Sequence, residues 1–401
     1  MTVLTDDLAP QLPVEANDLL LQVTCLHAAG KITINADLIA AYQAASSPHS
    51  IRALKSDLEA FDLWCRRTNR IALPASPEIV ADYLDARAGQ GARPASLGRY
   101  KASIAKIHQL LDLKDPTQAE LVKLRLRAIR REKGTAQAQA RPLRFKGPVR
   151  DVERDKPRGI NIRALLEACA DDLPGLRDRA LLSVAYDTGL RASELVAIEV
   201  EHILEALDPE ARLLAIRRSK GDQEGEGATA FLSPRSVRAI TAWTEEAGIS
   251  QGPLFRRVQV RRYKARAAVK GRSIDSITGR ETWDLRKTLS RPAVAARTEY
   301  DIGSVALHPG SIGPIYRAMI QRAFDSGALA DLTADDMVRL LKGVSAHSTR
   351  VGLNQDLFAS GEDLAGIMDA LRWKSPRMPL AYNRNLAAEA GAVGRLLERL
   401  R

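Results

Sequence analysis

The chain has 401 residues, enough for two or three domains that each bury a core. Hydrophobic residues make up 45% and charged residues 27%, while aromatics are scarce at 4%, so the cores are expected to consist of Leu, Ala, Ile and Val. The net charge of +11 and the pI of about 9.7 indicate a polyanionic partner, and because no apolar run could span a bilayer, nucleic acid is favoured over a membrane.

The first 45 residues are acidic to neutral, lack the basic start of a signal peptide, and are expected to form a loose arm with a short helix near Asn17–Ala28. Residues 46–134 are expected to form an all-helical domain. Ser47 or Ser50 can cap its first helix. An apolar face with helical spacing marks that helix and comprises Leu54, Leu58, Phe61 and Cys65. Three more helices are expected within 76–91, 93–113 and 117–134, the last of them strongly basic at its end.

The stretch from 135 to 159 contains prolines, a glycine and many basic residues without a helical period, which is typical of an interdomain linker. Its charge suits a segment that lies along a phosphate backbone, with Arg144 and Lys146 as candidate contacts. The alternative is a solvated tether.

A second domain is expected over 160–401. It begins with helices and a tight turn, and two β-prone runs, Leu213–Arg217 and Ala228–Leu232, flank a polar turn and predict a hairpin. After a helix near Pro234–Ala247, the very basic and weakly periodic stretch 256–305 is interpreted as an inserted loop or small subdomain near DNA. Helices resume near Ser311. The fold class is therefore mainly α, with a small β-hairpin or sheet in the second domain.

The three cysteines, Cys25, Cys65 and Cys169, lie far apart, and no Cys or His pair has metal-ligand spacing. Neither a disulfide framework nor a zinc site is expected, and a reducing cytoplasm is the expected compartment.

The second domain contains the residue types that cleave a phosphodiester without a metal. Such chemistry needs a nucleophile, cations on the non-bridging oxygens and a proton for the leaving oxygen. Guanidinium groups match phosphate bidentately, and a tyrosine can hold the cut end as an ester. The candidate catalytic residues, in chain order, are Arg191, Glu194, Lys220, His347, Arg350, Trp373 and Tyr382.

Each of these residues alone is a weak indication. The H-x-x-R spacing of His347 and Arg350, for example, also occurs at His49 and Arg52. A lone Lys220 is most often a solvated hairpin lysine. The inference depends on their order and spacing together, in a basic chain without metal motifs.

That order and spacing resembles the tyrosine recombinase (phage integrase) family. The resemblance runs from about Ser47 to the C-terminus. It is densest in HSTRVGLNQDLFASGEDLAGIMDALRWKSPRMPLAYNRNLAAEAGAVGRLLERL, and SDLEAFDLWCRRTNR and VADYLDA also contribute. The resemblance implies a C-shaped clamp of two domains around duplex DNA, with the helical first domain as its core-binding part.

The resemblance also implies roles for the residues at the scissile phosphate. Arg191 and Arg350 would clamp the phosphate, His347 and Trp373 would add hydrogen bonds, and Glu194 would support the clamp from behind. Tyr382 would be the nucleophile that forms a 3′-phosphotyrosyl link, and Lys220 the general acid for the 5′-hydroxyl.

The activity implied is site-specific recombination through a Holliday junction, without metal or ATP, by a protein of bacterial, phage or plasmid origin. The target would be a specific, inverted-repeat duplex site, bound by a tetramer. A final helix over 387–401, whose apolar stripe is Ala390, Val393, Leu396, Leu397 and Leu400, would dock into a neighbouring protomer. The alternative is that this helix packs on its own domain.

The residues that read DNA would lie at the starts of two helices of the first domain. Those candidates are His49, Ser50, Arg52, Ser96, Arg99, Tyr100 and Lys101. Each could contact a base or a phosphate, or lie on a solvated surface.

The chain departs from the family pattern in three places. The insertion 256–305 is much longer than the corresponding connection, and the helix near Ser311 lacks an arginine expected at a base, so the target sequence should differ. The interdomain linker is also longer and more basic. A telomere resolvase or type IB topoisomerase would share the chemistry, but the likeness through the last helix argues against both. A DNA-binding protein that has lost the reaction is a further alternative, although Arg191, Arg350 and Tyr382 are all present. A membrane-surface protein is the least favoured reading.

Overall fold

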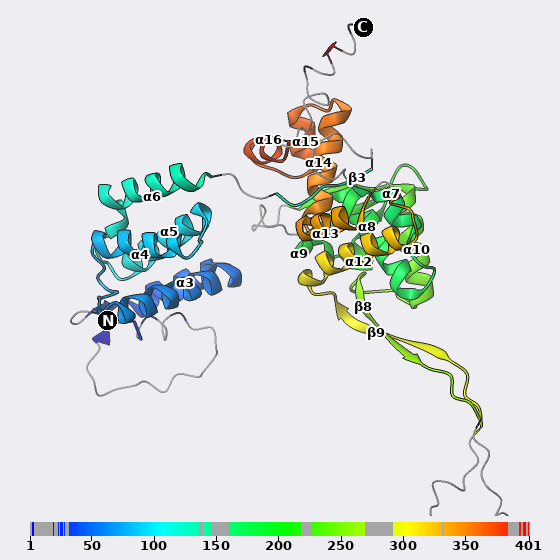
Figure 1. The fold of residues 1–401 in the computed structure, drawn as a ribbon, viewed down its shortest axis with the longest axis horizontal. Helices are drawn as coiled ribbons and strands as arrows, with labels where there is room; N and C mark the ends of the chain where they lie inside the picture. The colour runs from blue at the N-terminus through cyan, green and yellow to red at the C-terminus, as the bar shows by residue number, and fades with distance from the viewer. Residues whose placement is uncertain are drawn as a thin grey trace, which may run out of the picture. The chain divides into compact units, whose positions relative to one another are not determined.

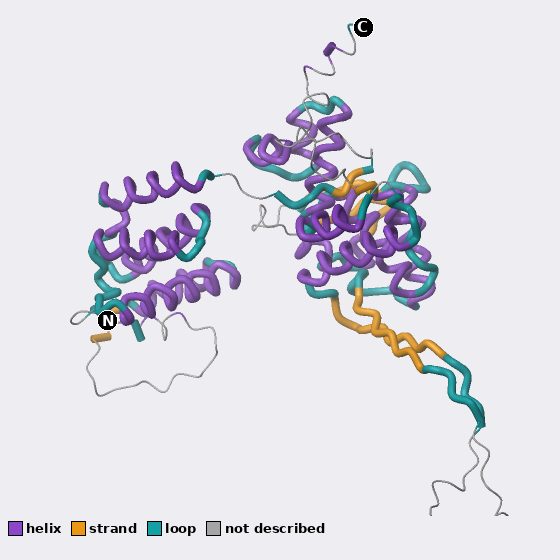
Figure 2. Tube along the Cα trace, in the orientation of Figure 1, coloured by secondary structure: helices purple, strands orange, loops and turns teal. Residues whose placement is uncertain are grey.

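The computed structural model describes residues 32–135, 139–145, 160–217, 227–268, 292–330 and 332–383, and a few separate positions before 32 and after 383. The chain divides into two compact units, Met1–Ala138 and Gln139–Arg401. Helices predominate in both units, and the strands are few and short apart from one ribbon (Figure 2). The fold is mainly α, as the sequence predicts. No helix in the described part of the chain is long and apolar enough to cross a membrane.

The first unit is a group of helices that begin at clear capping signals. Ser47 and Ser76 each accept a hydrogen bond from a backbone N–H one turn on, and a proline follows each of them at the first helical position. The helices are α2 (Ala36–Ala45), α3 (Pro48–Arg67), α4 (Pro77–Gly89), α5 (Pro94–Leu110), the 3-10 turn η1 (Pro116–Gln118) and α6 (Glu120–Lys133). The predicted helices within 46–134 correspond to α3, α4, α5 and α6.

Part of the expected N-terminal arm belongs to the core of this unit. The helix α2 was not predicted, and β1 (Thr2–Val3) pairs antiparallel with β2 (Thr33–Ile34). Leu19 and Ile39 are fully buried in one cluster with Leu58 of α3. Most of the helix expected near Asn17–Ala28 lies outside the described residues. The described apolar side chains of residues 1–45 thus complete a core that the sequence assigned to the helical domain alone.

The second unit surrounds one large hydrophobic core and a smaller satellite cluster. Its helices are α7 (Ile162–Glu167), α8 (Leu173–Thr188), α9 (Ala192–Val196), η2 (Val200–His202), α10 (Pro234–Ala247), η4 (Pro309–Ser311), α12 (Ile312–Asp325), α13 (Ala334–Gly343), α14 (Ser348–Ser360), α15 (Leu364–Ala370) and α16 (Arg377–Tyr382). The predicted hairpin is present, and a third strand extends it to an antiparallel sheet of β5 (Ile203–Glu205), β6 (Arg212–Ile216) and β7 (Ala228–Leu232).

Residues 139–145 of the expected linker are part of the second unit. There, β3 (Leu143–Arg144) pairs in parallel with β4 (Ile160–Asn161). The backbone of β3 passes so close to α14 that a Cβ on Gly352 would lie 1.7 Å from the Leu143 carbonyl oxygen. The sequence places Arg144 along DNA, but the structure buries it to 2% exposure and pairs its Nε with Asp356 at 2.7 Å. Arg144 therefore holds β3 inside the protein, which corrects the prediction; Lys146 lies outside the described residues.

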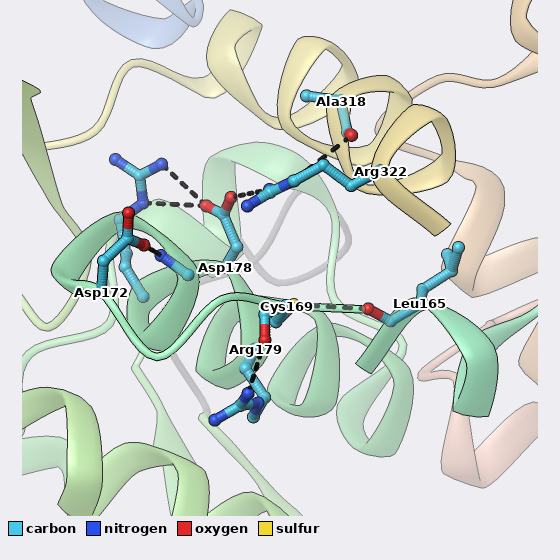
Figure 3. Close-up of polar contacts among 9 residues, drawn as sticks. Leu165, Cys169, Asp172, Asp178, Arg179, Ala318 and Arg322 are labelled. Carbon is cyan, nitrogen blue, oxygen red and sulfur yellow. Dashed lines mark hydrogen bonds and ion pairs between the residues drawn. The ribbon is translucent and has the colours of Figure 1, made fainter. Parts of the chain in front are cut away.

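A buried carboxylate joins α8 to α12 in the second unit. Asp178 Oδ1 accepts from Arg177 Nη2 at 2.7 Å, and its Oδ2 accepts from Arg322 Nη2 at 2.6 Å (Figure 3). Because breaking a buried pair leaves an uncompensated charge, this arrangement fixes how the two helices pack. Cys169 lies nearby, where burial raises the pKa of its thiol to about 11 and makes it unreactive.

The basic insertion is built on a two-stranded ribbon rather than an irregular loop. β8 (Arg256–Tyr263) pairs antiparallel with β9 (Arg297–Ala306), and the ribbon extends away from the body of its unit (Figure 1). In the part of the ribbon that the structure describes, its base packs on the core through Val258 and Ile302. Residues 269–291 lie outside the described part of the chain.

Candidate active site

The turn after α8 presents the first predicted catalytic pair. Gly189 ends α8 with φ +56°, and a Cβ there would lie 2.4 Å from Leu371 Cδ2, so glycine suits both the turn and the close packing. Arg191 follows directly before α9. Its Nη1 donates to Glu194 Oε1 at 2.8 Å, and its backbone N–H donates to Glu194 Oε2 at 3.0 Å. Glu194 thereby fixes both the backbone and the guanidinium of Arg191.

The beginning of α14 supplies the second pair. His347 directly precedes the helix, and Arg350 lies in its first turn with only 1% of its surface exposed. The Arg350 guanidinium donates to the Gly189 and Leu371 carbonyl oxygens and lies 4.8 Å from the ring centroid of Trp373. These contacts leave Arg350 in one position, beside the turn that leads to Arg191.

Tyr382 is the last residue of α16 and is held against α14. Gln355 Nε2 donates to the Tyr382 carbonyl oxygen at 3.0 Å, while Asn354 Nδ2 donates to Asn383 Oδ1 at 2.8 Å. The Tyr382 ring lies 5.5 Å from that of Trp373, centroid to centroid. Its hydroxyl oxygen lies 2.8 Å from His347 Nε2. The tyrosine is therefore placed by its backbone, by its ring and by its hydroxyl.

Several guanidinium groups make this region strongly electropositive. Burial lowers the pKa of Arg350, and the charges of Arg191 and Arg372 lower it further. Burial also lowers the pKa of His347, with Arg350 and Arg191 adding to the shift, so the ring is neutral at pH 7. Burial alone would raise the pKa of Glu194, but the hydrogen bonds from Arg191 outweigh it, and the carboxylate stays ionised. The Glu194 carboxylate neutralises one of the three positive charges of Arg191, Arg350 and Arg372. The site therefore keeps a net positive charge that can bind an anion.

Burial raises the pKa of the Tyr382 hydroxyl, and the charges of Arg350 and Arg191 act in the opposite direction. The free tyrosine is thus protonated at neutral pH, with a neutral imidazole as its hydrogen-bond partner.

Six of the seven predicted catalytic residues come together through these contacts, and the seventh, Lys220, lies outside the described residues. The sequence missed Arg372, which has φ +53° and donates from Nη2 to the Thr188 carbonyl oxygen at 2.7 Å. No sequence signal marks a left-handed arginine, although its place beside Trp373 could have drawn attention. Within the described residues, no group of three or more His, Cys, Asp or Glu side chains could hold a metal ion.

The candidate DNA-reading residues lie in the first unit, at the starts of α3 and α5. His49, Ser50 and Arg52 are exposed. Arg99 is half-exposed, pairs with the buried Asp57 at 3.0 Å and stacks 5.2 Å from the Tyr100 ring. The ion pair would orient the Arg99 guanidinium, and the exposed edge of the guanidinium could still contact DNA.

Beside them, a basic groove of about 370 Å³ lies between α5 and α6. Its lining consists of Gly98, Lys101, Lys123, Leu126, Arg127 and Arg130. From the sequence, Lys101 was a candidate DNA contact and the end of α6 was recognised as basic. The α6 cations Lys123, Arg127 and Arg130 were not predicted individually. Ser96 is half-buried at the start of α5.

The chain is also similar to known proteins. The model of the phage integrase family matches residues 158–290. The recombinase cre of Escherichia phage P1 is 26% identical over 358 residues, covering 88% of this chain and 89% of the relative. An integrase/recombinase xerD homolog of Selenomonas ruminantium is 31% identical over 219 residues, covering 52% of this chain and 59% of the relative.

Among solved structures, the XerH site-specific recombinase, in a post-cleavage complex with palindromic difH substrate, aligns with a TM-score of 0.53 at 12% identity. The alignment covers 91% of this chain and 82% of that one. This likeness concerns the fold. The family model and the two sequence relatives, rather than this fold likeness, support the tyrosine recombinase (phage integrase) family for this chain, as a site-specific recombinase.

Proposed function

We propose that this recombinase cleaves and rejoins duplex DNA through a 3′-phosphotyrosyl intermediate formed on Tyr382. The observation that supports this most directly is the 2.8 Å hydrogen bond between the Tyr382 hydroxyl and His347 Nε2. A protonated nucleophile next to a neutral base is the arrangement that activates a hydroxyl for attack. The histidine accepts through Nε2, which requires its own ring proton on Nδ1.

In this proposal, the tyrosine oxygen attacks the scissile phosphorus and its proton passes to His347. The P–O5′ bond breaks, and Lys220 gives its proton to the departing 5′ oxygen. Rejoining reverses the step, with a 5′-hydroxyl attacking the phosphotyrosine. Because one ester replaces another, the bond energy is retained and no ATP is needed.

The arginines Arg191 and Arg350 would hold the two non-bridging oxygens of the phosphate, with His347 and Trp373 as further donors. The pKa of Arg350 supports this role: burial lowers it, the charges of Arg191 and Arg372 lower it further, and a bound phosphate would offset that repulsion. Fixed charges aimed at an oxyanion in a buried site commonly contribute several kcal/mol to the transition state, about 3–4 per donor. Charge stabilisation of this kind makes a metal unnecessary.

The partner is duplex DNA carrying a specific site, which we infer to be an inverted repeat. The +11 charge, the basic groove between α5 and α6, and the exposed starts of α3 and α5 support a DNA-binding surface on the first unit. The two units would close around the duplex as a clamp.

Recombination would proceed through a Holliday junction in a tetramer joined by the predicted helix over 387–401, most of which lies outside the described residues. The described side chains of its apolar stripe support this assembly, because Val393, Leu396, Leu397 and Leu400 are 55–73% exposed in the single chain. Apolar side chains left in water are typical of a surface that a second copy covers.

Covalent capture tests the proposed chemistry. The full chain is mixed with short, nicked fragments of its source genome, so that the cut piece diffuses away, and the mixture is quenched with denaturant. We expect DNA to remain attached to the wild type and not to Tyr382→Phe. Tight binding without attachment in the wild type would instead favour a DNA-binding protein that has lost the reaction.

A further inference from the structure

We infer that the β8–β9 ribbon is a second binding site for duplex DNA, which contacts phosphates through one face. The inference extends the proposed function, because it adds a DNA contact that neither Tyr382 nor the first unit provides. The candidate phosphate contacts are Arg262, Lys264 and Arg266, here called the cationic face.

The sequence concentrates positive charge in this part of the chain. Residues 256–306 hold 13 of the 60 Lys and Arg residues but only 5 of the 49 Asp and Glu residues. Within the described residues of the ribbon, the side chains from 261 to 268 are all exposed. The described residues 256–268 and 292–306 alone hold seven Lys and Arg against two Asp and Glu, and such an excess on one element is an electrostatic footprint for a polyanion.

The strand register sorts these charges between two faces. Val260 pairs with Tyr300 and Arg262 with Thr298, and the isolated bridge between Arg266 and Val294 continues the same register past the end of β8. Side chains of paired residues share a face, and successive residues alternate. The cationic face therefore carries Arg262, Lys264 and Arg266 on β8 and its extension.

The acids of the ribbon lie on the other face. Glu299 pairs across the strands with Arg261, and Asp301 with Gln259. Arg297 Nε lies 3.1 Å from Glu299 Oε1, so charge on that face is partly neutralised within the protein. Among the described residues, no carboxylate pairs with a cation of the cationic face. On one face of the ribbon, positive and negative side chains thus partly neutralise each other. On the cationic face, no described carboxylate neutralises the positive charge.

The spacing of the cationic face suits a nucleic-acid backbone. Same-face residues on one antiparallel strand are about 6.8 Å apart, twice the axial spacing of about 3.4 Å between phosphates of one DNA strand. A two-stranded ribbon also fits the dimensions of a DNA groove. Tyr300 and Val260, nearer the body on the same face, add an apolar surface for the sugars.

The ribbon also lacks the stabilisation expected of a free-standing element. A two-stranded ribbon is marginally stable alone in water, and among the described residues of this ribbon Val258 and Ile302, at its base, pack on the core. A partner that covers the outer part would supply what the protein does not, and the charge selects a polyanion as that partner.

Binding in the Tyr382→Phe background tests the inference independently of the proposed cleavage chemistry. Full-length Arg262→Gln/Lys264→Gln is compared with the matched variant Arg261→Gln/Arg297→Gln, which removes the same charge from the opposite face. The probe is a random-sequence 40-base-pair duplex, titrated at several salt concentrations. Losing two phosphate contacts should reduce the slope of log K against log salt by about 1.8 in the first variant. The second should change it by less than about half of that. Equal slopes in the two variants, or no change in either, would overturn the inference.

A photo-crosslink gives a second readout that does not depend on ribbon stability. Tyr300 is 37% exposed on the cationic face and Tyr263 is 41% exposed on the opposite face. Benzoylphenylalanine placed at 300 should crosslink to DNA, and the same group at 263 should do so at least several-fold less. Crosslinking from 300 to a second protein copy instead would show that the ribbon is a protein interface.

Discussion

His347 Nε2 and the Tyr382 hydroxyl oxygen lie 2.8 Å apart, so the proposed nucleophile is already hydrogen-bonded to its proposed general base before DNA binds. The family resemblance implied that this histidine bonds to the scissile phosphate. The structure adds that the free enzyme uses it to hold the tyrosine. Both contacts are compatible if the imidazole turns from hydroxyl to phosphate as the proton moves.

This relationship predicts the pH dependence of cleavage. Burial, Arg350 and Arg191 hold the pKa of His347 below its ordinary 6.5, so the base is neutral at pH 7. The rate constant for covalent attachment should be level from about pH 7 to 8 and fall about tenfold per unit below the pKa of the histidine. In His347→Gln, the rate should drop by about 10²–10⁴ and lose its acid limb. An acid limb that persists in this variant would assign it to another group.

Arg372 is predicted to contribute charge to the phosphate site. Arg372→Gly suits the left-handed backbone at φ +53° and removes only the guanidinium, so the free energy of unfolding should change by less than about 2 kcal/mol. We expect cleavage to slow by about 5–20-fold, as for one charged contact of about 1–2 kcal/mol. Stopped time courses of covalent attachment measure this. Wild-type rates in Arg372→Gly would limit the arginine to holding the loop at Thr188.

Lys220 is predicted to protonate the leaving 5′ oxygen. Lys220→Ala should slow attachment by about 10²–10⁴ on ordinary DNA. A substrate with sulfur in place of the bridging 5′ oxygen has a leaving group that needs no proton, so its cleavage should be nearly equal in the variant and the wild type. A defect that remains with the sulfur substrate would remove Lys220 from the acid role.

Asp356 is predicted to be a main anchor of the second unit. It accepts from Arg144 Nε at 2.7 Å, from the Phe145 backbone N–H at 2.8 Å and from the Tyr186 hydroxyl at 2.5 Å. Asp356→Ala leaves Arg144 buried without its partner and should reduce the free energy of unfolding by about 3–5 kcal/mol.

The control for Asp356 is Asp171→Ala, which breaks the pair with Arg179. The Asp171 side chain is 89% exposed, so this change should cost about 1 kcal/mol or less. Urea unfolding followed by circular dichroism compares the two. Similar losses in both variants would contradict the anchoring role of Asp356.

The site was more predictable than the fold around it. Arg191, Glu194, His347, Arg350 and Tyr382 are residue types that phosphodiester chemistry requires, and their order and spacing, together with the family resemblance, singled them out. Their order and spacing are visible in the sequence without any knowledge of how the chain packs.

Non-local contacts account for what the sequence did not predict. Leu143 and Arg144 lie in a stretch with the composition of a linker. The structure shows that they pair with Ile160 and Asp356, which are distant in the chain. The β8–β9 ribbon lacks a regular apolar alternation because most of it is exposed, which removes the usual signal for strands. Leu19 and Ile39 join the first core only through tertiary packing.

The central claim is that Tyr382 becomes covalently linked to a 3′ phosphate. The most direct test is to digest the captured protein–DNA adduct with nuclease and protease and to sequence the modified peptide by mass spectrometry. We expect a nucleotide on the Tyr382 peptide and a released strand whose 5′ end a kinase labels without phosphatase treatment. A nucleotide on any other residue, or a 5′ phosphate on the released strand, would contradict it.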